Sequence, residues 1–350
     1  MTALTMSARP GNDTDLRPVP WRRMAWVTWR QHRFALAGVA GLLGVLAAYL
    51  VFTGLPMHHA YAALTACRPA GSLACNNAIV DFDNAHWSTA EAIAVLLQVV
   101  PALIGAFSAA PILAQELETG TFRYTWTQGF GRARWTLAKL VPLAVTVAAA
   151  AGAFSVLFSW YFAPFAVQGL QTRLPPLAPL VFDLRGVAFA AWTLAAFSIG
   201  ALAGMLIRRV VPAIVATLVA YAALAFAAGT WLRPAYATPV VTSSLNVPGS
   251  AWVMSQWWTK GGKFAFSGWP PARLLNQYCP AGPPVPVGPG GTTKAVGIAE
   301  CLTPHGYTQW TSYQPASRFW AFQWIEGGWL LVLSALLIAA TVWLVRRRAT

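Results

Sequence analysis

Few residues of this chain could do chemistry, because only 10 Asp and Glu and 5 His occur among its 350 residues. Carboxylate and imidazole groups are common ligands of divalent metals. The candidates by residue type are Asp81, Asp83, His86, His58, His59 and His305. Their spacing matches no strong metal-binding motif. We therefore expect polar loop residues here and no metal site.

The motifs that would mark an enzyme are missing from the sequence. A P-loop needs G-x-x-x-x-G-K-[ST], whose backbone N–H groups and lysine hold phosphates. The one Gly-Lys pair, Gly262-Lys263, is followed by Phe264. The G-x-S-x-G motif of a serine nucleophile is also absent. We expect that the chain is not an enzyme and binds no cofactor.

Two acids stand in residues 115–139, a segment otherwise rich in arginine. Glu116 and Glu118 are followed by Gly120, which can end a helix, and by Thr121, which can cap the next one. This pattern predicts a short amphipathic helix between two turns, and such a helix can dock in a groove of a soluble protein. The alternative is a solvated loop whose charges avoid lipid.

Another acid, Glu326, lies near the start of the last apolar segment. An ionisable residue inside a membrane span is costly and is a candidate for function. One interpretation makes Glu326 and Gln323 a substrate contact or an outer gate, with Glu326 polarised by Arg318 or Gln323. The other is a structural acid that reaches water or pairs with a neighbouring helix.

The composition places these residues in a membrane protein. The chain is 57% hydrophobic and 10% charged, whereas soluble domains carry about 25% charged residues. Disorder is excluded by the same numbers. The net charge of +14 is spread in short groups, unlike the single basic face of a nucleic-acid-binding protein.

Six apolar stretches are long enough to cross a bilayer, which takes about 20 helical residues. They run over 34–55, 92–114, 140–165, 186–207, 210–232 and 320–345. The fourth and fifth are separated only by Arg208 and Arg209, so a tight hairpin is expected there. The sequence predicts an all-α membrane protein with six transmembrane helices, an interfacial helix before the first and a large external loop before the last.

The basic residues orient these spans, because lysine and arginine favour the cytoplasmic side. With both termini cytoplasmic, the inner segments hold 15 of the 24 Lys and Arg residues. The predicted organisation is a disordered tail over 1–20, a six-span domain over 21–345 and a basic cytoplasmic tail over 346–350. Within the domain, 21–33 is the interfacial helix, 115–139 is cytoplasmic and 233–318 is the external loop.

All four cysteines fall in predicted external segments, where disulfides can form. The favoured pairings are local, Cys67 with Cys75 and Cys279 with Cys301, although four cysteines allow three connectivities. Free thiols are the alternative. Neither pair has the CxxC spacing of zinc sites.

Three short motifs carry a resemblance to a known family. They are Trp26-Val27-Thr28-Trp29-Arg30-Gln31-His32-Arg33 before the first span, the Glu-x-Glu-x-Gly-Thr segment after the second, and Arg318-Phe319-Trp320 with Gln323 and Glu326 at the last. With the six spans, they make residues 21–348 resemble the permeases of ABC-2 type transporters. In that family the Glu-Gly-Thr segment forms the coupling helix that contacts the ATPase subunit. The resemblance assigns to that contact Glu116, Glu118, Gly120, Thr121 and Arg123.

This resemblance implies the permease subunit of an ATP-driven exporter in the plasma membrane. ATP and Mg would be used by a separate ABC ATPase subunit. The other expected partners are a second permease copy or a related permease, and membrane lipid, but no nucleic acid. An apolar, aromatic-rich path favours an amphiphilic or hydrophobic cargo such as a natural product, drug or lipid. The alternative is a non-transporting scaffold or sensor subunit whose external Trp-rich loop binds a ligand or partner.

Overall fold

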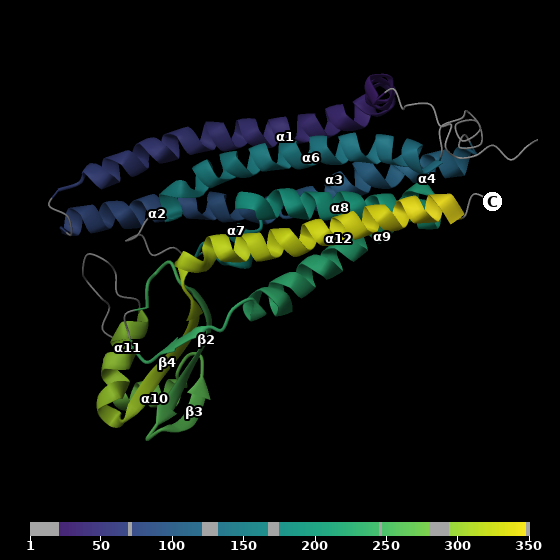
Figure 1. The fold of residues 1–350 in the computed structure, drawn as a ribbon. Helices are drawn as coiled ribbons and strands as arrows, with labels where there is room; N and C mark the ends of the chain where they lie inside the picture. The colour runs from purple at the N-terminus through teal and green to yellow at the C-terminus, as the bar shows by residue number, and fades with distance from the viewer. Residues whose placement is uncertain are drawn as a thin grey trace, which may run out of the picture.

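The computed structural model describes residues 21–68, 72–120, 132–166, 175–244, 247–279 and 294–347. Long helices lie side by side in a bundle, and a small sheet lies beside one end of it (Figure 1). We call this the sheet end. The opposite end, where helix α1 (Trp21–Ala66) begins and helix α12 (Phe319–Arg347) ends, is called the terminal end. The predicted tail over 1–20 lies outside the described residues.

Six helical segments in the described residues are long and apolar enough to span a membrane. The predicted six-helix fold is therefore confirmed. Their bounds are Leu36–Ala66, Asn77–Thr119, Ala133–Phe165, Gly186–Ile207, Val210–Ala235 and Ala316–Arg347. The start of α1 and the end of α12 share one end of the bundle (Figure 1), as an even number of crossings requires.

The first two helices extend well beyond the predicted spans. Helix α1 runs over Trp21–Ala66 and α2 over Leu73–Leu97. Asp81, Asp83, His86, His58 and His59 thus lie on helices, and the expectation of loop residues was wrong for them. The predicted interfacial helix over 21–33 is the first part of α1, and its opening turns are seen nearly end-on in Figure 1 while the rest is seen from the side.

The second span is a helix with an irregular middle. After α2 come α3 (Val100–Ile104), a π-helical turn η2 (Gly105–Ala109) and α4 (Ala110–Thr119). Pro101 and Pro111 lie in the first turns of α3 and α4. Because proline has no N–H to donate, it forces the hydrogen-bond register to change, and a π turn absorbs the change.

The third span is α6 (Arg132–Phe162), continued by the short turn η3 (Ala163–Ala166). A one-turn helix, α7 (Pro179–Phe182), precedes α8 (Gly186–Ile207). Helix α8 lies at the centre of the bundle and contacts α4, α6, α9 and α12. Its apolar span is 61% buried inside the protein, whereas the fifth span, which is also apolar, is 17% buried.

Glycine residues on α8 let its backbone lie directly against the backbone of the second span. A Cβ atom added at Gly200 would lie 2.4 Å from the Gly105 carbonyl oxygen, and one at Gly204 would lie 2.4 Å from that of Ala110. In lipid, where apolar surface alone does not drive helix association, such close packing is a main source of affinity between helices.

The predicted hairpin between the fourth and fifth spans is present. Arg208 ends α8 in the left-handed conformation, with φ of 59°, and the extended Arg209 precedes α9 (Val210–Ala227). Helix α9 continues through a π turn η4 (Ala228–Leu232) into η5 (Arg233–Ala235).

The predicted external loop contains a sheet that the all-α prediction did not include. Strands β1 (Val240–Thr242), β2 (Trp252–Lys260), β3 (Lys263–Ser267) and β4 (Tyr307–Gln314) pair antiparallel in the order β1-β4-β2-β3. The β2–β3 turn is Gly261-Gly262, both with positive φ, which two-residue hairpins require.

Two short helices, α10 (Ala272–Tyr278) and α11 (Lys294–Leu302), accompany the sheet. Trp258, Ile298, Leu302 and Tyr307 form a small core of their own between these elements. The chain then enters the last span through the turns η6 (Thr303–His305) and η7 (Ala316–Arg318) and helix α12 (Phe319–Arg347).

The close contact of α8 predicts a specific sensitivity to volume. We expect Gly200→Ala to destabilise the folded protein by about 1–3 kcal/mol, as overpacking does, because the new methyl group meets backbone rather than a flexible side chain. The matched control is Gly152→Ala on α6, where nothing lies within 4 Å of the added carbon. Thermal unfolding of both purified variants in one detergent measures the difference, and equal midpoints would contradict the packing.

Candidate functional site

Two polar clusters occupy opposite ends of the bundle, and the predicted site residues divide between them. The first lies at the terminal end, where α4 stops. Gly120 ends this helix in the left-handed conformation, with φ of 71°. Thr121 and Arg123, predicted to contact an ATPase, lie outside the described residues, and the chain is described again from α6.

Glu116 is partnered within the chain. Its carboxylate forms an ion pair with Lys139 of α6, and the Lys139 side chain is 5% exposed. The Lys139 ammonium also lies 4.5 Å from the centroid of the Trp135 ring, within range of a cation–π contact. The pair therefore joins the helices on either side of residues 120–131.

Glu118 is bound to a different helix. Its Oε2 accepts a hydrogen bond of 3.1 Å from the backbone N–H of Val210, the first residue of α9. An acid at a helix N-terminus satisfies a free N–H group and interacts favourably with the helix dipole. Together, Glu116 and Glu118 tie the end of α4 to α6 and α9.

The second cluster lies toward the sheet end and is built around Arg233, which is fully buried. Its Nε donates to Glu326 Oε2 at 3.0 Å, and its Nη2 donates to Glu326 Oε1 at 2.6 Å. The same Nη2 is paired with Asp183, the residue that follows α7. The Arg233 guanidinium lies 4.4 Å from the Phe182 ring centroid.

Two further donors complete the surroundings of Glu326. Trp192 Nε1 of α8 donates to Oε1 at 2.9 Å, and the Tyr236 hydroxyl donates to Oε2 at 3.3 Å. Trp329 Nε1 in turn donates to the Tyr236 oxygen at 2.7 Å. Glu326 of α12 is thus held by residues from α8 and from the end of α9.

The structure corrects the partner expected for Glu326. Arg318 donates instead to the carbonyl of Thr238 and to Gln314. Gln323 also acts elsewhere, because its Oε1 accepts from the Ala188 N–H at 2.8 Å and its Nε2 donates to the Phe182 carbonyl at 3.0 Å. Gln323 therefore fixes the start of α8.

Sequence reasoning missed Arg233 and Asp183, although both carried a signal. Arg233 was assigned to the external loop, but it directly follows an uncharged run of 23 residues, 210–232. Asp183 stands three residues before α8. Single charged residues at the same end of neighbouring spans can pair, and burial makes such pairing necessary.

Comparison of the sequence with models of known protein families identifies the family of the chain. A family model described as "ABC-2 membrane transporter related" matches residues 40–233, more than half of the chain. The chain belongs to this family. No curated protein and no solved structure matches it. With its six apolar spans, the chain is an ABC-2 type permease, and the match covers the first five spans through Arg233.

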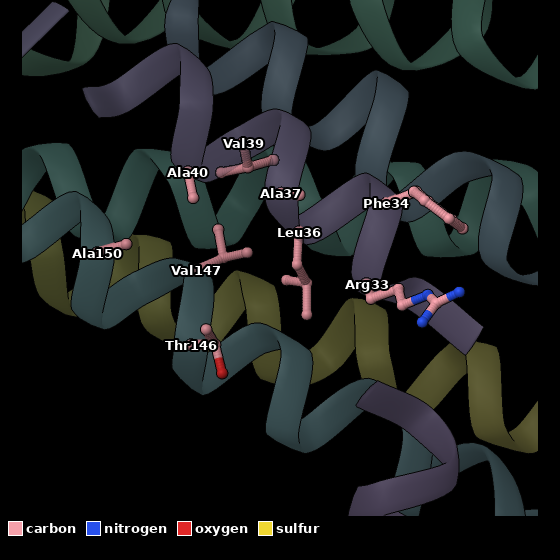
Figure 2. Close-up of a pocket in the computed structure, with 9 residues that line it drawn as sticks. All are labelled: Arg33, Phe34, Leu36, Ala37, Val39, Ala40, Thr146, Val147 and Ala150. Carbon is pink, nitrogen blue, oxygen red and sulfur yellow. The ribbon is translucent and has the colours of Figure 1, made fainter. Parts of the chain in front are cut away.

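This permease has an open groove of about 710 Å³ between α1 and α6, within the size range of ligand pockets. Figure 2 shows Arg33 and Ala150 at opposite ends of the groove. Between them the lining is apolar apart from Thr146, and includes Leu36 and Val147. The groove thus combines an apolar channel with one cation.

The cysteines follow the predicted pairing at one site and not at the other. Cys67 and Cys75 form a disulfide that closes the short connection from α1 to α2. The predicted Cys279–Cys301 disulfide is not formed in the structure, where both residues are free thiols. Their side chains approach closely enough to hydrogen-bond, but without a covalent bond.

In the described parts of the permease, no three His, Cys, Asp or Glu side chains gather as metal ligands would. His58 instead stacks on Trp160 of α6, with ring centroids 4.5 Å apart, and hydrogen-bonds its carbonyl at 3.0 Å. The candidate functional sites are therefore the two clusters in which a buried cation is paired with carboxylates.

The buried pair at the terminal end predicts an asymmetric response to mutation. Lys139→Met should destabilise the protein by about 3–5 kcal/mol, because Glu116 is left without its counter-ion. The double variant Glu116→Gln/Lys139→Met removes both charges and should recover most of this loss. Thermal unfolding in detergent compares the three proteins. A double variant no more stable than Lys139→Met would contradict the ion pair.

Proposed function

We propose that this chain is the transmembrane subunit of an ABC exporter and works with a separate ATPase that binds at the terminal end. The observation that carries the proposal is the tethering of α4. In an ABC-2 type permease, the residues after Gly120 correspond to the coupling segment, and Glu116 and Glu118 bind that segment's base to α6 and α9.

The contacts of Glu116 and Glu118 would let the segment between α4 and α6 transmit a movement to the helices. Movement of the segment between α4 and α6 would displace three helices together, because α4, α6 and α9 are linked there. Helix α9 reaches from Val210 toward Arg233. It thus connects the ATPase end with the charged cluster at the sheet end. In this proposal Glu116 and Glu118 fix the coupling segment, with Gly120, Thr121 and Arg123 as its nearest contact residues.

The proposed orientation places the terminal end in the cytoplasm and the sheet outside the plasma membrane. It is supported by the basic residues at the terminal end, among them Arg208, Arg209, Arg346 and Arg347, since positive charge favours the cytoplasmic side. A second permease copy or a related permease would cover part of α1 and α9, whose apolar spans are 11% and 17% buried.

We propose an amphiphilic or hydrophobic cargo that enters from the bilayer. The groove between α1 and α6 supports this, because it offers an apolar channel with Arg33 at one end. Such a site matches a molecule with an apolar body and a polar or anionic head. Export rather than import is part of this proposal.

A scaffold or sensor role is the second candidate, and the sheet favours it. Phe264 on β3 and Trp269 are more than half exposed. Exposed aromatic residues on an external sheet can bind a ligand or partner. This reading predicts that the chain forms no complex with an ATPase.

Affinity purification in mild detergent separates the two candidates. We expect a P-loop ATPase to co-purify in about equal amount and to hydrolyse ATP. The variant Glu118→Ala, which leaves the Glu116–Lys139 pair intact, should retain membrane insertion and ATPase binding but lose much of the cargo-stimulated hydrolysis, because the base of the coupling segment is no longer tied to α9. Asp81→Asn on α2 is the matched charge control. Isolation of the chain alone in several detergents would instead support the scaffold role.

Filling the groove tests the route of the cargo. Ala150→Trp should lower export of an amphiphilic dye several-fold without lowering expression, because the indole occupies the apolar channel. Leu336→Trp, at a 62% exposed position on α12, adds the same side chain outside the groove and outside the proposed permease interface, and should leave export unchanged. Dye accumulation in cells measures both variants. Equal export by the two would argue against the groove.

A further inference from the structure

The Arg233 cluster contains two carboxyl groups and one guanidinium group. Arg233 Nη2 donates to both Asp183 and Glu326, so the two carboxyl groups converge on one nitrogen. The side chains of Arg233 and Glu326 are fully buried, whereas the Asp183 side chain is 19% exposed. With all three groups ionised, the cluster would carry a net charge of −1.

A net charge at this place is unfavourable, because burial removes the water that would solvate it. The charge is not balanced by another cation in the described surroundings. Arg185, two residues from Asp183, is directed toward the Phe319 ring, with its guanidinium carbon 5.2 Å from the ring centroid. The other titratable groups near the two acids are Tyr221 and Tyr236.

The hydrogen bonds distinguish the two acids. Glu326 accepts four, from Arg233 Nε and Nη2, from Trp192 and from Tyr236. Donors therefore occupy both of its oxygens. Asp183 is paired with the one Arg233 nitrogen that it shares with Glu326. Asp183 is therefore the group better suited to carry a proton.

We propose that Asp183 and Glu326 bind one proton between them, carried on Asp183, and that this proton neutralises the cluster. The neutral cluster joins three parts of the fold at the sheet end. Asp183 follows α7, Arg233 follows α9 and η4, and Glu326 belongs to α12. The site is a proton-dependent latch between these segments.

The pKa of Asp183 supports this assignment. Burial raises the pKa of its carboxyl group to about 8. The Arg233 charge lowers this pKa, whereas the Glu326 charge and a hydrogen bond with Glu326 raise it. Since the folded-state pKa is above the unfolded value of 3.8, the protonated form stabilises the fold at low pH. That stabilisation declines as the pH rises from about 4 and is lost above about 8.

The role of the latch in transport rests on the proposed function. If the sheet end faces outside, the exposed part of Asp183 gives external protons access to the site. Protonation would hold the outer ends of α9 and α12 together, and deprotonation would weaken the junction. The ligand is thus the external proton, and it acts on the cluster that contains Glu326, for which an outer gate was one of the two interpretations of the sequence.

Infrared titration of the full chain in lipid nanodiscs tests the proton directly. A protonated carboxyl group has a C=O stretch that a carboxylate lacks. We expect the wild type to lose one such band with a midpoint near pH 8. Asp183→Asn should lack the band, whereas Asp81→Asn, which removes an exposed carboxylate on α2, should retain it. The readout requires neither ATPase nor cargo, so it fails independently of the proposed function.

Two outcomes would overturn the proposal. In the first, the wild type shows no carboxyl band that titrates between about pH 6 and about pH 10. In the second, the band is still present in Asp183→Asn. Size-exclusion chromatography verifies folding of each variant. If Asp183→Asn does not fold, Glu116→Gln/Lys139→Met takes its place: this variant removes the other carboxyl group held in a buried ion pair, and loss of the band in it would contradict the assignment to Asp183. A second readout is the unfolding temperature, which should fall from about pH 6 to about pH 9 more steeply in the wild type than in Asp183→Asn.

Discussion

A charged group inside a membrane bundle must find its counter-ion within the protein, and this constraint organises both ends of the permease. Lys139 meets Glu116 between α6 and α4, and Arg233 meets Glu326 and Asp183 at the sheet end. Because lipid cannot solvate such groups, each pair fixes the relative position of the helices that carry it. The net stability that the pairs contribute is limited, since burial of the charges offsets much of their attraction.

Helix α9 connects the two clusters. Its first N–H is bound by Glu118, and Arg233 lies one short π turn beyond its last residue. In the middle, α9 packs on α8, which approaches the second span at backbone distance through Gly200 and Gly204. Close contact of this kind leaves little room for independent sliding. A displacement of α4 is therefore expected to reach the sheet end through α8 and α9, as the proposed coupling to an ATPase would require.

The fold was largely predictable from the sequence because a bilayer imposes a simple rule on composition. The fourth span, 186–207, was predicted at its observed bounds, and the Arg208-Arg209 turn was expected from its charge. The first two helices were predicted too short, since α1 and α2 continue past the apolar runs as regular helix closed by the Cys67–Cys75 disulfide. The sheet was missed because register shifts in β2 interrupt the regular alternation of a strand, and because the strands lie within a segment rich in proline and glycine.

The sequence by itself determined the membrane class, the six spans and the residues worth testing, because apolar length and the distribution of charge are local properties of the chain. Only the tertiary structure decided the partners. Glu326 could have paired with Arg318, eight residues away, yet it pairs with Arg233, which is 93 residues distant. Glu116 likewise pairs with Lys139, which lies beyond residues 120–131 in the sequence. Such choices depend on which helices pack together and how each is rotated, and no local pattern carries that information.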